Sequence, residues 1–157
     1  MSTLEVKAIQ APSGFDLQMP SGAILQVVQS SYDTSVSTTS DSTYTDTGLT
    51  ATITPKFNSS KVLVRITQSG CHTNNSGTDI DLILLRGSTE IAQMAGLFME
   101  GITTGNLLIS NEWLDSPNTT SATTYKTQFR IGDDAGTAIV QNGSYGTSVI
   151  TLMEVAG

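Results

Sequence analysis

The stretch TSVITLMEVAG, Thr147–Gly157, decides the fold because apolar side chains occur on both faces of one alternating segment. Successive side chains of a strand point to opposite faces. One face carries Val149, Thr151, Met153 and Val155, and the other carries Ile150, Leu152 and Glu154. A strand that is apolar on both sides is usually buried on both sides. Either it is a central strand that its own chain covers, or its second face meets another copy of the chain, and the pattern leaves both open.

The stretch DLILLRG, Asp81–Gly87, has the same property. Because subunit interfaces are poor in charge, two-sided apolar strands can pack near a symmetry axis shared by several copies. Contact between several copies is therefore one of the two alternatives that the pattern leaves open. The candidate interface residues are Val149, Thr151, Met153, Val155, Ile83 and Leu85.

Alternation with a period of two recurs along most of the chain and predicts eight to ten short strands, which points to an all-β sandwich or barrel. A jelly roll needs about that many strands, and an antiparallel β-sandwich of the jelly-roll class is the fold we expect. In SKVLVRITQSG, Val62, Val64 and Ile66 share one face, opposite Leu63 and Arg65. RGST predicts a hairpin in which Gly87 supplies a positive φ.

Two other segments are less regular. For Thr89–Gly101, strand and loop are slightly favoured over a short helix because glycine interrupts the helical spacing. Residues 30–48, rich in Ser and Thr, are expected to form an exposed, twisted hairpin edge.

The 157 residues fit one domain. Residues 1–21 contain one short alternating segment followed by Pro and Gly, which predicts an arm that precedes a body of residues 22–157. Leu4, Val6 and Ile9 are the apolar docking candidates of this arm.

Charge excludes several classes of partner. Only 13% of the residues are charged, the net charge is −7, and the basic residues are scattered. Binding to nucleic acid or to an anionic membrane requires clustered cations, so neither is expected. No apolar run has the length of a membrane span, and the N-terminus lacks the apolar centre of a secretory signal.

The residues that carry chemistry are sparse, and we expect no enzyme, no cofactor and no metal site. His72 is the single histidine and Cys71 the single cysteine, so neither a nucleophile–base set nor a zinc site is indicated. The pairs Asp79/Asp81 and Asp133/Asp134 lack the spacing of a calcium loop, although calcium is not dismissed. Trp113 follows an apolar run and is expected in the core.

Six segments together resemble tail-fibre and virion proteins of tailed, cyanophage-like phages. They are MSTLEVKAIQAPSG, GAILQVVQ, LTATITPKFNSSKVLVRITQSG, LILLRGSTEI, WLDSPNTTSATTYKTQFRI and TSVITLMEV, and they occur in this order over nearly the whole chain. Each motif alone is weak, whereas the order is fairly specific.

The resemblance implies a virion component, assembled in the host cytoplasm, with a trimeric knob similar to the tumour-necrosis-factor jelly roll and no enzymatic activity. The arm would attach to other virion proteins of the tail or capsid. Exposed loops, with Asn118, Thr119, Thr120 and Tyr44 as candidates, would contact the host surface, where polysaccharide suits their hydroxyl and amide groups. The chain departs from the family in having no shaft, which leaves its place on the particle open. The alternatives are a capsid decoration protein without receptor binding, a carbohydrate-binding module and, least favoured, a polysaccharide hydrolase.

Overall fold

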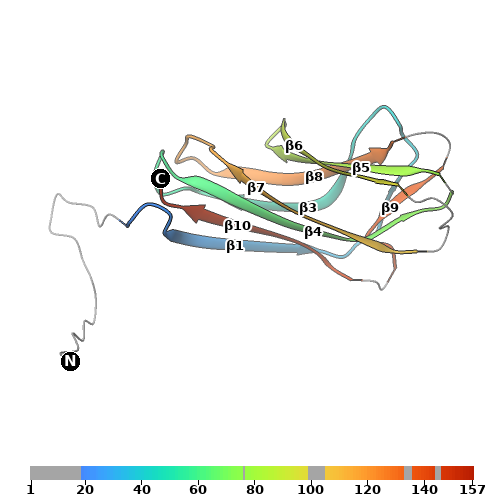
Figure 1. Cartoon of the computed structure of the whole chain (residues 1–157), viewed down its shortest axis with the longest axis horizontal. Helices are drawn as coiled ribbons and strands as arrows, with labels where there is room; N and C mark the ends of the chain where they lie inside the picture. Colours follow the sequence, from blue (N-terminus) through green and yellow to red (C-terminus); the bar gives the residue numbers. More distant parts are fainter. Residues whose placement is uncertain (1–18, 76, 99–104, 133–135, 144–145) are drawn as a thin grey trace, which may run out of the picture.

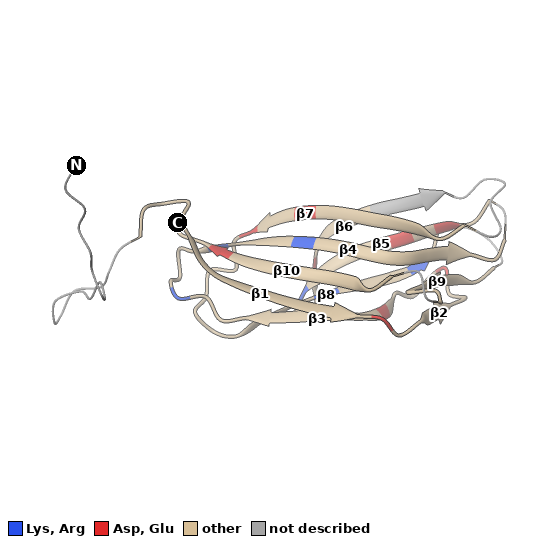
Figure 2. Cartoon of the chain, turned by 90° about the horizontal axis from the view of Figure 1, so that it is seen from below, with Lys and Arg blue, Asp and Glu red and all other residues tan. Residues whose placement is uncertain are grey.

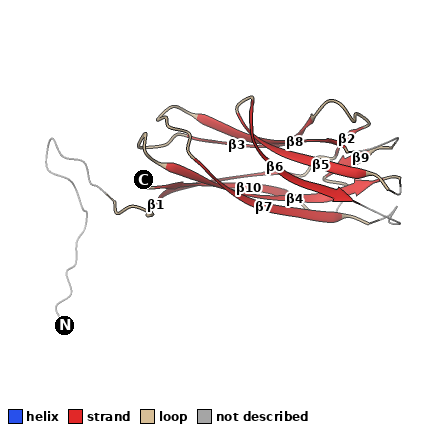
Figure 3. Cartoon of the chain, turned by 45° about the horizontal axis from the view of Figure 1, so that its top comes forward, coloured by secondary structure: helices blue, strands red, loops and turns tan. Residues whose placement is uncertain are grey.

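The computed structural model describes residues 19–75, 77–98, 105–132, 136–143 and 146–157, and within these ranges every regular element is a β-strand (Figure 3). The strands are β1 (Ile24–Tyr32), β2 (Val36–Thr38), β3 (Thr45–Ile53), β4 (Lys61–Thr73), β5 (Asp79–Arg86), β6 (Thr89–Phe98), β7 (Leu107–Asp115), β8 (Thr123–Ile131), β9 (Ala138–Val140) and β10 (Ser148–Val155). In this part of the chain no helix is long and apolar enough to cross a bilayer.

The strands form two antiparallel sheets that lie face to face (Figure 1). The large sheet has six strands in the order β1-β10-β4-β9-β2, with β7 paired to β4 on its other side. The small sheet has four strands in the order β3-β8-β5-β6. The predicted all-β, antiparallel, jelly-roll-like sandwich is therefore confirmed.

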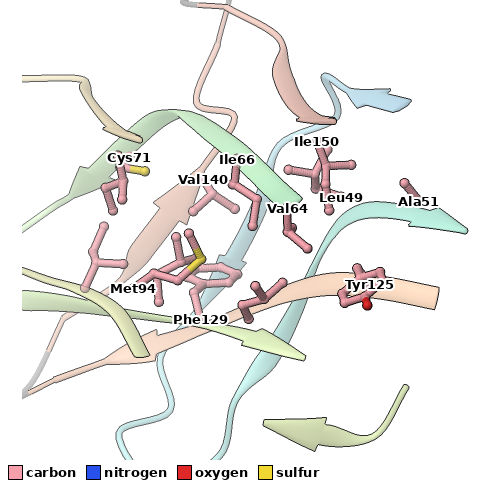
Figure 4. Packing of buried hydrophobic residues seen from close by; sticks show 14 of the residues in the cluster. Leu49, Ala51, Val64, Ile66, Cys71, Met94, Tyr125, Phe129, Val140 and Ile150 are labelled. Atoms are coloured by element: carbon pink, nitrogen blue, oxygen red, sulfur yellow. The ribbon is translucent and has the colours of Figure 1, made fainter. Parts of the chain in front are cut away.

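The core lies between the inner faces of the two sheets (Figure 4). Val62, Val64 and Ile66 of β4 are fully buried, as their alternation predicts. Tyr125 and Phe129 of β8 face them from the small sheet and are also fully buried. Burying one such side chain contributes roughly 1.5–3 kcal/mol before the entropy of ordering the chain is subtracted.

A chain of buried polar groups also crosses the core. Gln68 Nε2 and Gln141 Nε2 each donate to Ser148 Oγ at 3.0 Å within the large sheet. Thr127 Oγ1 of the small sheet donates to Gln68 Oε1 at 3.2 Å, and its hydroxyl lies 2.6 Å from that of Thr47. Because buried polar groups are costly when unpaired, this polar chain favours one alignment of the two sheets.

The predicted turn at RGST joins β5 to β6, with Arg86 paired to Thr89 across a two-residue loop. Gly87 has a φ of +61°, as the prediction requires. The preference for a strand over a helix after Thr89 is confirmed as far as Phe98, and residues 99–101 lie outside the described ranges.

The prediction of a hairpin for residues 30–48 is wrong. β1 belongs to the large sheet and β3 to the small sheet, so this segment crosses from one layer to the other. On the way, β2 pairs with β9 rather than with either neighbour in sequence. Alternation identifies a strand but carries no information on its partner, which is why the crossover could not be distinguished from a hairpin.

Candidate assembly interface

Four apolar side chains form one row across the outer face of the large sheet. Val27 pairs with Met153, Met153 with Leu63, and Leu63 with Leu114. Directly paired residues place their side chains side by side on the same face. Val27 is 57% exposed and Leu114 is 50% exposed, while Met153 and Leu63 are half-buried. The row therefore forms a continuous apolar band over β1, β10, β4 and β7.

A second pair widens this band. Ile24, which is 48% exposed, pairs with the half-buried Val155 on the same face. We call the six residues Ile24, Val27, Leu63, Leu114, Met153 and Val155 the outer apolar patch. An exposed apolar group of this kind on a soluble protein commonly marks an interaction site.

Few charges interrupt this face, as Figure 2 shows for β1, β10, β4 and β7. Its charged side chains along these strands are Lys61, Arg65 and Glu112. Arg65 Nε lies 3.3 Å from Glu112 Oε1, and both side chains are more than half exposed, so the pair adds about 0–1 kcal/mol at most. The chain carries a net charge of −7, but two copies that meet through this face bring no excess of negative charge together.

The structure places the six predicted interface residues on two different surfaces. Val149, Thr151, Met153 and Val155 all lie on the outer face of the large sheet and are half-buried. Ile83 and Leu85 lie on the outer face of the small sheet, where they are only 3% and 6% exposed.

The neighbours of Ile83 and Leu85 explain this burial. β5 lies between β8 and β6, and Gln128 and Lys126 of β8 pair with Ile83 and Leu85. The aliphatic parts of such long polar side chains cover apolar neighbours while their polar ends reach water. The two strands with apolar residues on both faces therefore differ. The chain itself covers the outer face of β5, whereas the outer face of β10 stays partly exposed.

Ile24, Val27, Leu63 and Leu114 were not predicted to belong to this surface. The signal for Leu63 was present, because it alternates with the core residues of its own strand. Ile24, Val27 and Leu114 become neighbours of Leu63 and Met153 only through the order and register of the strands, which a single sequence does not contain.

Glu154 lies directly behind the patch, on the inner side of β10, and is fully buried. Its Oε1 accepts a hydrogen bond from the backbone N–H of Lys56 at 2.7 Å, and its Oε2 accepts one from Gln26 Nε2 at 2.6 Å. Burial acts to raise the pKa of this carboxyl, but the hydrogen bonds outweigh it and the pKa lies below its ordinary value. The carboxylate fixes the start of β1 and the β3–β4 connection against β10.

A second buried carboxylate joins the two sheets. Arg86 Nη1 donates to both oxygens of Asp115, at 2.9 and 2.8 Å, and Tyr125 Oη donates to Asp115 Oδ2 at 2.7 Å. Burial, and then the hydrogen bond and charge of Asp115, raise the pKa of Tyr125. This cluster holds the end of β7, next to Leu114, against β5 and β8.

The predicted contact residues lie at opposite ends of the sandwich. Asn118, Thr119 and Thr120 precede β8, whose first residue Thr123 pairs with Ile53. Tyr44 precedes Thr45, which pairs with Phe129 near the other end of β8. A strand of nine residues is roughly 25–30 Å long, so these residues do not form one surface. Asn118 and Thr120 are exposed, while Thr119 and Tyr44 are half-buried.

Tyr44 is held by Arg130, whose guanidinium carbon lies 4.8 Å from the centroid of the Tyr44 ring. Arg130 also donates to Asp81 Oδ2 from Nε and Nη2, at 3.0 and 2.9 Å. The arm candidates Leu4, Val6 and Ile9 lie outside the described residues.

The prediction that Trp113 packs in the core is wrong, because its side chain is 45% exposed. Trp113 pairs with Val64 and so belongs to the inner face of the large sheet. It lies on β7, which is an edge strand of the large sheet. The strand opposite, β6, is the edge strand of the small sheet. The layer opposite therefore covers Trp113 only in part.

Among the described residues, those considered for chemistry do not assemble into a reactive group. His72 Nδ1 lies 3.1 Å from the carbonyl oxygen of Gly105. Burial raises the pKa of the Cys71 thiol to about 12, which makes it a poor nucleophile. Asp81 pairs with Arg130, and Asp133 and Asp134 lie outside the described residues. Among the residues that are described, no three potential ligands of the His, Cys, Asp or Glu type come together as a metal site.

Comparison with known proteins gives a likeness of fold. No protein-family model matches the sequence, and no curated protein matches it. A solved structure of the VP2 subviral particle of infectious bursal disease virus is similar to 97% of this chain, with a TM-score of 0.56 and 17% identity. A structure of the Gt strain of this virus is similar over the same share, with a TM-score of 0.49 and 12% identity. The chain spans 38% and 43% of the lengths of these two proteins.

Proposed function

We propose that this protein is a structural component of a virion: a short trimeric fibre or knob that assembles through the outer face of its large sheet. The outer apolar patch is the observation that carries this proposal. An isolated copy leaves these six side chains partly in water, and packing against other copies removes them from it. Each 100 Å² of apolar surface buried contributes about 2.5 kcal/mol towards association before its entropic cost.

Two independent likenesses support the assignment to a virion. The order of six sequence motifs resembles tailed-phage tail-fibre and virion proteins. The fold is similar to part of a protein that occurs in a viral particle, at an identity too low to indicate more than fold.

The proposed arm defines a direction for the proposed knob. Residues 1–21 would form the attachment arm, which enters the sandwich beside Ala156 at the end of the large sheet. Asn118–Thr120 lie at this same end, whereas Tyr44 lies at the far end. With the arm docked on tail or capsid proteins, Tyr44 and the hydroxyl-rich residues 35–43 face the host, so polysaccharide contact belongs there rather than at Asn118.

The mass of the purified full-length chain in solution tests this proposal. Sedimentation equilibrium at micromolar concentration is expected to give three copies of the 16.5 kDa chain. A single-copy species would remove the basis of the trimer. Electron cryo-microscopy of the intact virion that the protein is proposed to belong to then tests whether the chain lies on the tail or on the capsid. A virion in which this chain is not found would overturn the virion assignment.

A capsid decoration protein without receptor binding is the nearest alternative, and a glycan array on the trimer with no bound sugar would favour it. The half-exposed indole of Trp113 favours another candidate, a carbohydrate-binding module, because aromatic faces stack on sugar rings. A module of that kind is expected to be a monomer whose sugar affinity is lost in Trp113→Ala.

A further inference from the structure

β1 leaves one long edge of the large sheet without a strand partner among the described residues. It is nine residues long and pairs with β10 on one side only, through eight of them. Edge strands of soluble proteins usually carry charges or proline, which prevent unwanted strand addition. The other edge strands of eight or more residues do so: β3 contains Asp46, β6 contains Glu90 and β7 contains Glu112. β1, with the sequence ILQVVQSSY, contains neither charge nor proline.

The chain that precedes β1 approaches from the paired side of that strand. Ala23 N donates to Pro20 O at 3.0 Å, which closes a turn directly before β1. Within this turn Gly22 N donates to Ala156 O at 2.8 Å, on the β10 side. Met19 lines a shallow depression together with Phe57, Ser59, Ala156 and Gly157. Residues 19–22 of the same copy therefore lie by the end of β10, on the side away from the free edge of β1.

The arm contains a segment suited to strand addition. In residues 3–10, TLEVKAIQ, Leu4, Val6 and Ala8 share one face and Glu5, Lys7 and Ile9 the other. Placed beside β1, Leu4 and Val6 can extend the apolar row that begins at Val27. The eight residues between this segment and Met19 can span roughly 25 Å when extended, enough to reach a neighbouring copy that packs on the patch.

We propose that residues 3–10 of one copy add as a strand to the free edge of β1 in a neighbouring copy. This inference rests on the proposed function, since it requires copies that pack side by side. Added strands gain backbone hydrogen bonds along the whole edge and specificity from alternate side chains. The exchange would pair the free backbone groups of β1 and tie the copies together through their arms. It would assign Leu4 and Val6 to a neighbouring copy rather than to tail or capsid proteins.

Cross-linking between two different full-length chains tests the exchange. One chain carries Val6→Cys with Cys71→Ser, and the other carries Val27→Cys, Gln29→Cys or Ser31→Cys with Cys71→Ser, so that a covalent dimer of unlike chains forms only between copies. After mixing and mild oxidation with diamide, we expect this dimer for at least one β1 position, at several times the yield of the exposed control Ser88→Cys. Circular dichroism and the thermal midpoint of each variant verify that it folds.

No excess of cross-link at any β1 position over Ser88→Cys would overturn the exchange. A separate chain that carries Val6→Cys and one β1 cysteine together gives a second test, because cross-links formed only within that chain would also overturn it. Hydrogen exchange adds a readout without cysteines. Amides of residues 3–10 are expected to exchange at least tenfold more slowly in the oligomer than in the Val6→Pro variant, which cannot continue a strand ladder. A trimer whose arm amides exchange freely would refute the exchange and leave the proposed function standing, whereas a monomer would refute the proposed function itself.

Discussion

Gly48 lies in the bulged part of β3 with a φ of +84°, and a Cβ atom at this position would collide with the ring of Tyr32. Tyr32 is the last residue of β1, so this contact connects the edges of the two sheets. We expect Gly48→Ala to lower the free energy of unfolding by about 2–4 kcal/mol, through backbone strain and overpacking together. Urea denaturation measures the change.

Gly77→Ala is the matched control for this substitution. Gly77 has nearly the same φ, +83°, but nothing lies within 4 Å of the added Cβ. We expect Gly77→Ala to lower the free energy of unfolding by about 1–2 kcal/mol, because backbone strain at positive φ is its only cost. If both variants lose the same free energy of unfolding, the collision of the new Cβ atom with Tyr32 does not destabilise the fold.

Glu154 predicts a pH dependence of stability. Its pKa is lower in the folded chain than the ordinary value of 4.5, so the carboxylate stabilises the fold above that pH and the contribution is lost as the pH falls through the folded value. Glu154→Gln replaces one carboxylate oxygen, which accepts hydrogen bonds, by an NH₂ group, which can only donate them. Because that NH₂ group would face other donors, we expect the substitution to lower the free energy of unfolding by about 1–3 kcal/mol at pH 7. The difference between wild type and variant should shrink below pH 4.5.

Thermal midpoints from pH 7 to pH 3 measure this effect. Glu112→Gln, in the exposed pair with Arg65, serves as the control and should change stability by less than about 0.5 kcal/mol across the range. A Glu154→Gln deficit that stays constant down to pH 3 would contradict the role assigned to the carboxylate.

Between elements, the Arg86–Asp115–Tyr125 cluster predicts coupling between the two sheets. Tyr125→Phe removes one hydrogen bond to a carboxylate and is expected to cost about 1–2 kcal/mol, whereas Asp115→Asn also leaves the partly buried Arg86 without its charge partner and should cost more. A double-mutant cycle on unfolding free energies is expected to show a coupling of at least about 0.5 kcal/mol. Additive losses would mean that the two contacts act independently.

β5 and β10, which carry apolar residues on both faces, show what could and could not be predicted for single strands from the sequence. The alternation of Thr147–Gly157 and of Val62–Ile66 was sufficient to predict both strands and which residues share a face, but it left open what covers the second face of Thr147–Gly157. It could not separate β10 from β5, since the cover on Ile83 comes from Gln128, which is 45 positions away in sequence. Trp113 and residues 30–48 were mispredicted for the same reason: exposure and pairing depend on which strand is an edge, and strand order is a property of the whole sheet.

At the scale of the whole molecule, the candidate site was predicted in part. The terminal strand was identified from its own residues, but the patch needs four strands in one register, and four of its six members were recognised only in the structure. The separation of Asn118 from Tyr44 by the length of the sandwich was likewise absent from the sequence.

Met153, at the centre of the patch, predicts a change in assembly without a change in fold. We expect Met153→Glu to weaken association at least tenfold, because a charge at the middle of an apolar contact is desolvated without a partner. Thr124→Glu, on the half-buried outer face of the small sheet, is the matched control and should assemble as the wild type does. Sedimentation velocity over a concentration series measures both, and equal assembly of the two variants would place the interface elsewhere.

The positions of Met19 and Gly157 bear on how the molecule resists mechanical force. Both lie at the same end of the large sheet, where the β1–β10 ladder starts. Tension applied between them would open that ladder by unzipping, one hydrogen bond after another, rather than by shearing many bonds at once. In the assembly proposed above, drag would therefore have to pass through contacts between copies and not through the paired ends of a single chain.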